Sequence, residues 1–224
     1  MTVAAVLKDL ESLATAETRA GMARFGIPNH HALGVTMRDM RAYAKARGKD
    51  HLLAGGLWQT GIYEARTVAA FMADPKALTP QQMDQWAQDF DNWAICDTVC
   101  YHLFDRSPHA WDRVRIWAPD DREFVRRAAY ALIWSLSVHD KHASQKQFVA
   151  ALGLIEQAPA DDRPLVKKAM DMALRAVGKR DQALNQSAIA TAKAMSESPR
   201  PATAWIGRHA LKELASQKVQ SRWQ

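Results

Sequence analysis

The sequence predicts an all-α protein. Apolar residues recur with helical periodicity along nearly the whole chain, and no segment shows a convincing alternating strand pattern. Helix-breaking residues fall at regular intervals and leave about a dozen amphipathic segments of ordinary helix length. The chain has 224 residues, of which 48% are hydrophobic and 24% are charged. That composition is sufficient to bury a full core and excludes wholesale disorder.

Glycine, proline and capping residues mark where the predicted helices begin and end. The breaks fall at Gly26-Ile27-Pro28, Gly48, Gly55-Gly56, Gly61, Asp74-Pro75, Thr79-Pro80, Ser107-Pro108, Pro119, Pro159, Pro164, Gly178 and Ser198-Pro199-Arg200-Pro201. Thr79 places a capping hydroxyl before a proline at the first helical position, and Ser107 is expected to do the same. Helix starts are therefore predicted at Pro80 and Pro108.

Short connections between these segments predict antiparallel neighbouring helices. Helix pairs recur at roughly 35–45 residues, the spacing of HEAT-like helical repeats, although the repeats share little sequence. No long linker divides the chain. We therefore expect a single HEAT-like repeat domain over residues 1–224. Its helix pairs would form a curved right-handed superhelical stack, an α-solenoid, with a helical bundle as the alternative.

Charge and cysteine content bear on the partners and the cellular compartment of the protein. The 30 lysines and arginines exceed the 24 acidic residues and give a net charge of +6 and a pI of about 9.4. This excess is compatible with a polyanionic partner but does not require one. Cys96 and Cys100 lie four residues apart on one predicted helix, where the geometry opposes a disulfide. Charged residues interrupt the N-terminal apolar stretch, and the longest apolar run, residues 128–134, is too short to cross a bilayer. We expect a cytoplasmic protein with no membrane partner.

One predicted helix carries an aspartate beside an indole and a thiol. Within residues 91–100, Trp93 and Asp97 lie one helical turn apart, and Cys100 falls on the same arc. Apolar residues form a different arc, which a core would cover. A carboxylate held beside an indole and away from the packing face can face a cationic target. The alternative is a structural carboxylate bound to a neighbouring helix, which is the commoner role of a helical aspartate.

The segment 166–180 gathers basic residues on one face. Lys168, Met172 and Arg175 lie opposite its apolar face, and Lys179 follows if the helix continues past Gly178. Such a stripe is compatible with a phosphate-rich partner, but a solvated helix face is the commoner explanation of a charged stripe.

The predicted helix 123–138 adds to this pattern. Arg127, Tyr130 and Trp134 share one arc, and an arginine beside aromatic rings can stack and still donate to phosphate. Trp134 is equally plausible in the core, with Arg127 lying over it. Together the helices favour a basic, aromatic-lined concave surface.

The order and spacing of these motifs resemble the AlkD-like DNA alkylation repair proteins, bacterial glycosylases built from HEAT-like repeats. The resemblance runs from about Arg24 to the final helix. Its landmarks are Ala32-Leu33-Gly34-Val35, Leu57-Trp58-Gln59-Thr60-Gly61, Glu64-Ala65-Arg66, Asn92-Trp93 with Cys96-Asp97, Phe124-Val125-Arg126-Arg127-Ala128, Val138-His139-Asp140-Lys141, Val166-Lys167-Lys168-Ala169, Ala173-Leu174-Arg175 and Gly178-Lys179-Arg180.

The resemblance implies a DNA glycosylase of base excision repair, nucleoid-associated in a bacterium. Its substrates would be N3- or N7-alkylated purines in duplex DNA, such as 3-methyladenine and 7-methylguanine, and its product an abasic site. By the same resemblance, Asp97 is the catalytic carboxylate, Trp93 borders the lesion and Arg127 contacts the DNA backbone. AlkD-like enzymes work without extruding the damaged base, so no deep base-reading cavity is required.

The chemistry of such a substrate fits a single carboxylate. An alkylated purine is cationic and leaves readily, so Asp97 has only to stabilise an oxocarbenium-like sugar and guide a water molecule. Trp93 can hold the cationic nucleotide by a cation–π contact. The expected DNA-binding residues are Arg127, Lys168, Met172, Arg175, Lys179 and Arg180. No cofactor or metal is expected, because the two cysteines and His102 fit no zinc pattern and the thiols suit a core.

One departure from the family pattern concerns Asp171 and Met172. Many relatives have an asparagine-tryptophan pair at this point, and that tryptophan helps to form the aromatic walls of the lesion cleft. Met172 keeps the apolar contact but lacks the indole face. Two other functions therefore stay open: a non-catalytic protein that binds damaged or branched DNA, and a protein-binding scaffold with an apolar face. We expect a monomer, which would leave the concave face free for duplex DNA.

Overall fold

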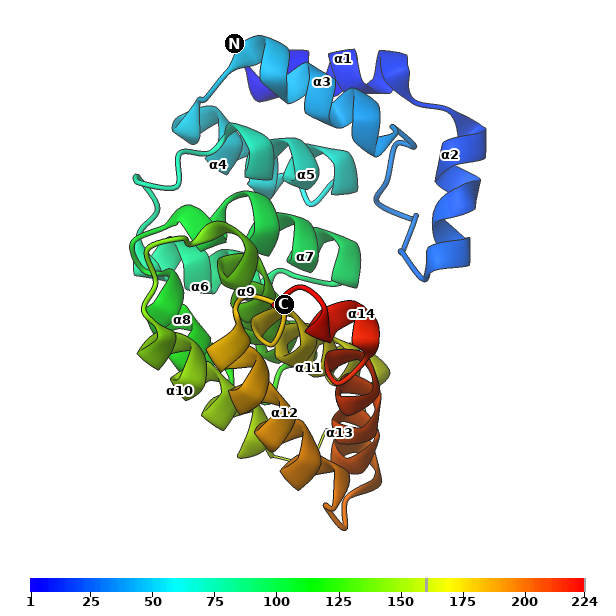
Figure 1. The fold of residues 1–224 in the computed structure, drawn as a ribbon. Coiled ribbons are helices and arrows are strands. Elements are labelled where there is room, and N and C mark those ends of the chain that lie inside the picture. The colour runs from blue at the N-terminus through cyan, green and yellow to red at the C-terminus, as the bar shows by residue number, and fades with distance from the viewer. Residues whose placement is uncertain (160, 224) are drawn as a thin grey trace. The chain divides into compact units, whose positions relative to one another are not determined.

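A computed structural model describes residues 1–159 and 161–223 of the chain (Figure 1). The chain divides into two compact units, residues 1–109 and residues 110–224. Every regular element in the described ranges is a helix, which confirms the all-α prediction. The single domain and the curvature of the stack stay predictions.

The first unit includes α7, the helix that carries Trp93 and Asp97. Its elements are α1 (Val3–Leu13), α2 (Ala16–Gly21), the 3-10 helix η1 (Met22–Phe25), α3 (Met37–Arg47), α4 (His51–Gln59), α5 (Tyr63–Met72), α6 (Pro80–Gln88), α7 (Trp93–His102) and the 3-10 helix η2 (Phe104–Arg106). Helix α5 packs against α3, α4 and α7. Figure 1 shows α3, α5 and α7 stacked one above another, so these three helices form one row of the unit.

A pair of stacked tryptophans lies in the core of the first unit. The rings of Trp58 and Trp86 are parallel within 2°, and their centroids are 4.0 Å apart. Both side chains are buried, and the indole N–H of Trp58 donates to Asp89 Oδ2 at 2.8 Å. Phe90 packs edge-on against Trp58. The pair therefore joins α4 to α6, and the indole N–H of Trp58 is satisfied.

One of the two predicted proline starts is confirmed and the other is wrong. The hydroxyl of Thr79 accepts the N–H of Gln82 at 3.1 Å, and α6 begins at Pro80. The hydroxyl of Ser107 instead accepts the N–H of His109 at 3.3 Å, and the next helix begins only at Ala110. A hydroxyl bonded two residues ahead closes a local turn, which competes with a helix start.

The second unit contains the remaining helices. They are α8 (Ala110–Trp117), α9 (Glu123–His139), α10 (Gln145–Glu156), α11 (Pro164–Val177), α12 (Gln182–Ser196), α13 (Pro201–Leu214) and the short α14 (Gln217–Gln220). Helix α9 confirms the predicted helix 123–138. Helix α11 ends at Val177, before Gly178, so Lys179 lies beyond the helix. Within the described ranges, no helix is long and apolar enough to cross a membrane.

Close helix packing organises the second unit. Helix α11 packs against both α9 and α13, so these three helices form a row, and α12 packs along α13. At Gly207 the approach of α12 to α13 is so close that a Cβ atom would lie 2.3 Å from Ser196 N and 2.6 Å from Ala192 O. The lack of a side chain at this position therefore permits the contact.

Candidate active site and nucleic-acid interface

Trp93 and Asp97 lie one turn apart on α7, as the sequence predicts. Asn92 caps the helix, since its Oδ1 accepts the N–H of Ile95 at 3.0 Å and its Nδ2 donates to the carboxylate of Asp91 at 2.7 Å. Trp93 and Asp97 are both half-buried. The cap fixes the first turn, and an indole and a carboxylate stay accessible on the same helix.

A hydrogen bond fixes the indole of Trp93. Its Nε1–H donates to the carbonyl oxygen of Phe25 at 2.8 Å. Phe25 is the last residue of η1, and Gly26 follows with a φ of 65°, which lets the chain turn away at once. The orientation of Trp93 therefore depends on the position of η1.

Glu64 holds the loop that follows η1. Its carboxylate is fully buried and accepts the N–H groups of Leu33, Gly34 and Val35 at 2.8, 2.7 and 3.2 Å. These charge-assisted bonds tie the loop to α5. In the sequence, Glu64 stands out only as part of the Glu64-Ala65-Arg66 landmark. Its place on the buried face of α5 indicates a structural role, because a buried carboxylate is tolerated only when it is paired.

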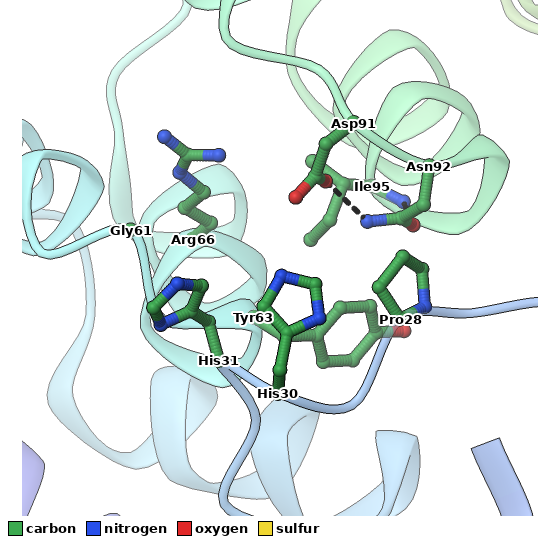
Figure 2. Close-up of a pocket in the computed structure, with 9 residues that line it drawn as sticks. All are labelled: Pro28, His30, His31, Gly61, Tyr63, Arg66, Asp91, Asn92 and Ile95. Atoms are coloured by element: carbon green, nitrogen blue, oxygen red, sulfur yellow. Dashed lines mark hydrogen bonds between the residues drawn. The ribbon is translucent and has the colours of Figure 1, made fainter. Parts of the chain in front are cut away.

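A small polar recess lies beside the start of α7. Figure 2 shows the loop that carries His30 and His31 facing the segment of Asp91 and Asn92. The recess is lined by Pro28, His30, His31, Gly61, Tyr63, Arg66, Asp91, Asn92 and Ile95. Arg66 is engaged with the protein, since it donates to the carbonyl of Asp89 at 2.9 Å. Both histidines are exposed loop residues.

Cys96 and Cys100 are fully buried, which confirms that the thiols belong to the core. Burial raises the pKa of the Cys100 thiol above its ordinary value, so the thiol stays protonated and unreactive. The predicted arc that groups Cys100 with Trp93 and Asp97 is wrong. The last turns of α7 are covered on more than one face, because Val99 and Cys100 are both fully buried.

The predicted aromatic and basic arc of α9 lies largely inside the second unit. Arg127 is 5% exposed and donates to the carbonyl oxygen of Leu165 at 2.5 Å. Tyr130 is fully buried, and burial raises its pKa to about 12. Tyr130 therefore belongs to the core, and its predicted place on a DNA-facing surface is wrong. Helix α9 is covered by both α8 and α11, which a single helical wheel does not reveal.

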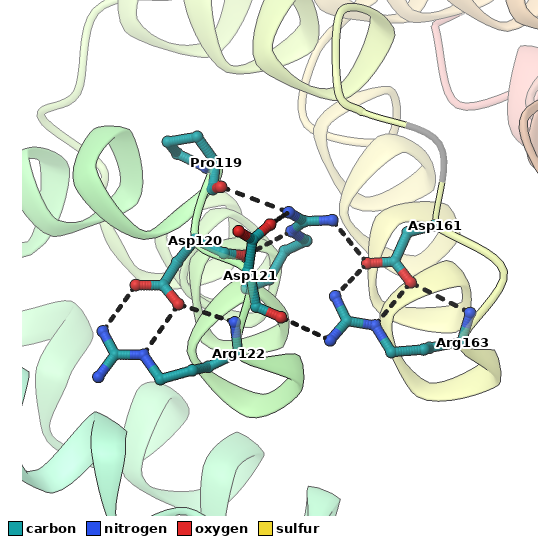
Figure 3. Close-up of polar contacts among 7 residues, drawn as sticks. Pro119, Asp120, Asp121, Arg122, Asp161 and Arg163 are labelled. Atoms are coloured by element: carbon teal, nitrogen blue, oxygen red, sulfur yellow. Dashed lines mark hydrogen bonds and ion pairs between the residues drawn. The ribbon is translucent and has the colours of Figure 1, made fainter.

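An ionic cluster beside Arg127 joins the start of α9 to the start of α11 (Figure 3). Arg126 and Asp161 are both buried and pair at 2.8 Å, and Arg163 also pairs with Asp161. Burial by itself raises the pKa of Asp161, but hydrogen bonds from Arg163 and Arg126 outweigh it and lower this pKa. The neighbouring Asp120 binds Arg122 and, through its carbonyl oxygen, Arg126. This cluster sets α11 against α9.

Helix α11 places Lys168 and Met172 away from the core, as predicted. Lys168 is exposed and Met172 is half-buried. In the described part of the chain, Lys168 takes part in no hydrogen bond or ion pair. Lys168 is therefore available to a phosphate, and Met172 offers a neighbouring apolar contact.

Arg175 and Lys179 are bound to carboxylates within the protein. Arg175 pairs with Asp171 at 2.9 Å and with Glu213 at 2.5 Å, and Lys179 pairs with Glu213 at 2.7 Å. Asp171 is 3% exposed and also accepts from His209 Nδ1 at 2.8 Å. Partial burial by itself raises the pKa of Glu213, but hydrogen bonds from Lys179 and Arg175 lower it to about 2. The predicted cationic stripe is thus largely neutralised.

These contacts belong to a regular set between α11 and α13, which we call the α11–α13 ladder. The ladder consists of three contacts at four-residue steps: Lys167 with Trp205, Asp171 with His209, and Arg175 with Glu213. Each helix therefore presents one residue per turn to the other on the solvent side of the packing face.

Arg180 supports the fold. Its guanidinium donates to the carbonyl oxygens of Ser137 and Asp140 at 2.8 and 2.5 Å and lies 4.4 Å from the centre of the Phe148 ring. It therefore ties the segment after α11 to the end of α9. A role for Arg180 in DNA binding stays a prediction.

Comparison with known proteins identifies the relatives of this chain. The family model described as DNA alkylation repair enzyme matches residues 6–214. A solved structure is described as a member of a new family of proteins related to the HEAT-like repeat DNA glycosylases with affinity for branched DNA structures. It matches with a TM-score of 0.75 and 24% identity over 95% of each chain, which confirms the HEAT-like fold. No curated protein matches the chain. The match of the family model over nearly the full sequence shows that the chain belongs to the DNA alkylation repair enzyme family.

Proposed function

We propose that the protein is a DNA glycosylase that hydrolyses the N-glycosidic bond of N3- and N7-alkylated purines in duplex DNA. The observation that carries this proposal is the arrangement on α7. Asp97 remains half-buried, one turn from a half-buried Trp93 whose indole N–H is fixed by the carbonyl of Phe25. Membership of the DNA alkylation repair family adds support.

The proposed roles follow from the charge of the substrate. The alkylated base already carries a positive charge, so it needs no proton to leave. As the bond breaks, positive charge develops on the sugar, and the carboxylate of Asp97 stabilises it and orients the attacking water. The face of Trp93 binds the cationic base before the bond breaks. Lys168 contacts a phosphate of the same DNA.

Release of 7-methylguanine from methylated duplex DNA tests the proposal. In single-turnover assays, Asp97→Asn should slow release by about 100-fold or more, because it removes the charge that stabilises the transition state. DNA affinity should change little. The matched control is Asp162→Asn, which removes an exposed carboxylate remote in sequence from α7 and should keep the wild-type rate. Absence of release by the wild type, or equal rates for wild type and Asp97→Asn, would exclude this glycosylase function.

A second candidate is a non-catalytic protein that binds branched or damaged DNA. One observation favours it: position 172 carries methionine rather than tryptophan. The structurally similar protein has affinity for branched DNA. This candidate predicts tight binding to a four-way junction without base release. Met172→Trp tests whether the methionine limits excision. Faster base release by this variant would support the glycosylase function over the non-catalytic one.

A further inference from the structure

Trp205 exposes an indole on α13 in the second unit. Trp205 is 36% exposed, although the large apolar residues Ile206 and Leu214 of the same helix are buried. Its ring stacks on His209, with centroids 5.0 Å apart and planes within 6°. The ammonium of Lys167 lies 4.8 Å from the centre of the indole. An exposed tryptophan with ordered neighbours is a surface suited to an aromatic ligand.

The α11–α13 ladder holds this indole in place. His209, on which Trp205 stacks, is itself bound to the buried carboxylate of Asp171 at 2.8 Å. The next contact of the ladder, between Arg175 and Glu213, fixes the same two helices one turn further along. Trp205 is therefore positioned before any ligand binds, which lowers the entropic cost of stacking.

The surroundings of Trp205 are cationic. Asp171 and Glu213 are the only acidic residues in the sequences of α11 and α13, and both are paired with basic side chains. Lys168 and Arg208 are exposed and have no hydrogen-bonded or ion-paired partner among the described residues. The ligand that fits this surface has a flat aromatic ring and nearby negative charge.

We propose that Trp205 stacks on an unpaired nucleobase of DNA while Lys167, Lys168 and Arg208 contact the adjoining phosphates. Within a duplex, base faces are covered by neighbouring bases, so only a base at a gap, flap or junction presents its face. The incoming base takes the place of the Lys167 ammonium on the indole, and that flexible side chain turns to a phosphate. This inference rests on the proposed association with DNA, but it does not require excision.

Fluorescence anisotropy with two labelled DNAs tests the inference. One probe is an intact duplex, and the other is the same duplex interrupted by a short single-stranded thymidine gap. The wild type should prefer the gapped probe, and Trp205→Ala should weaken binding to it by about 5- to 150-fold, the range for loss of one stacked base. Trp205→Phe should retain part of the preference, since phenylalanine keeps an aromatic face. Ile116→Ala is the control, because it removes another exposed apolar side chain, on α8.

The outcomes separate this inference from the proposed excision. Equal affinity of wild type and Trp205→Ala for the gapped probe overturns the stacking role, as does an equal loss in the alanine and phenylalanine variants. If the wild type releases 7-methylguanine but shows no preference for the gap, the glycosylase function stands and this inference fails. If the preference depends on Trp205 while no base is released, this inference stands and the glycosylase function fails.

Discussion

Glu213 shows how one carboxylate changes the role of two basic residues. Arg175 and Lys179 were predicted as DNA contacts from their place on a helical wheel, yet both donate to Glu213, 38 and 34 residues further along the chain. A helical wheel contains no information on residues of another helix. The face of α11 was therefore predictable, whereas the ion pairs that neutralise it were not.

The pKa of Glu213 makes the stability of the protein depend on pH. Its folded-state pKa of about 2 lies below the ordinary value of 4.5, so the carboxylate stabilises the fold at pH values above 4.5. This contribution declines as the pH falls from 4.5 towards 2, because the unfolded state then binds a proton more readily. We expect Glu213→Gln to flatten the fall in unfolding free energy over this range, as measured by urea denaturation at several pH values.

Glu156 provides the control for that experiment. It is exposed at the end of α10, and Glu156→Gln should leave the pH dependence of the wild type nearly unchanged. Parallel pH profiles for wild type and Glu213→Gln would contradict the assigned coupling of Glu213 to Arg175 and Lys179.

At the scale of helices, the α12–α13 contact depends on the absence of a side chain at Gly207. We expect Gly207→Ala to destabilise the protein by about 2 kcal/mol or more, because the new methyl group would meet backbone atoms that cannot yield like the tip of a side chain. Gly153→Ala is the counterpart. No atom lies within 4 Å of its added Cβ, and alanine in α10 should stabilise by about 0.5–1 kcal/mol. Thermal unfolding of both variants measures the contrast, and a stabilised Gly207→Ala would refute the close approach.

The helices themselves were largely predictable from the sequence, and their limits less so. Thr79 and Pro80 start α6 as expected because capping is a local interaction. Ser107 does not start a helix, because its hydroxyl accepts the N–H of His109 and closes a turn. Serine hydroxyls form such turns as readily as helix caps, so the sequence does not distinguish the two. The burial of Tyr130 and Arg127 could not be predicted from α9 alone, because it depends on the packing of both α8 and α11 against α9.

At the scale of the whole molecule, the 30 lysines and arginines overstate the cations available to DNA, because several of them are bound to carboxylates within the protein. Besides Arg175 and Lys179, Arg126 and Arg163 are paired with Asp161. A basic composition therefore indicates a polyanionic partner only after the internal pairs are known.

Salt dependence of duplex binding measures this effect. Glu213→Gln should raise the affinity for duplex DNA and steepen the slope of log K against log salt by about 1, because it releases Lys179 for a phosphate contact while Arg175 stays paired with Asp171. Glu156→Gln changes the net charge equally but releases no cation, so its slope should match that of the wild type. Equal slopes for the two variants would show that Lys179 does not reach the DNA.

The stacked indoles of Trp58 and Trp86 give the first unit an optical signature of its own. Two indoles whose ring centroids are 4.0 Å apart couple their electronic transitions, and an in-plane rotation between their transition dipoles makes this coupling visible as an exciton signal in circular dichroism, which is lost when α4 and α6 separate. Both partners lie within residues 1–109. The signal therefore reports the melting of this unit alone, and its comparison with the helical signal of the whole chain reveals whether the two units unfold together.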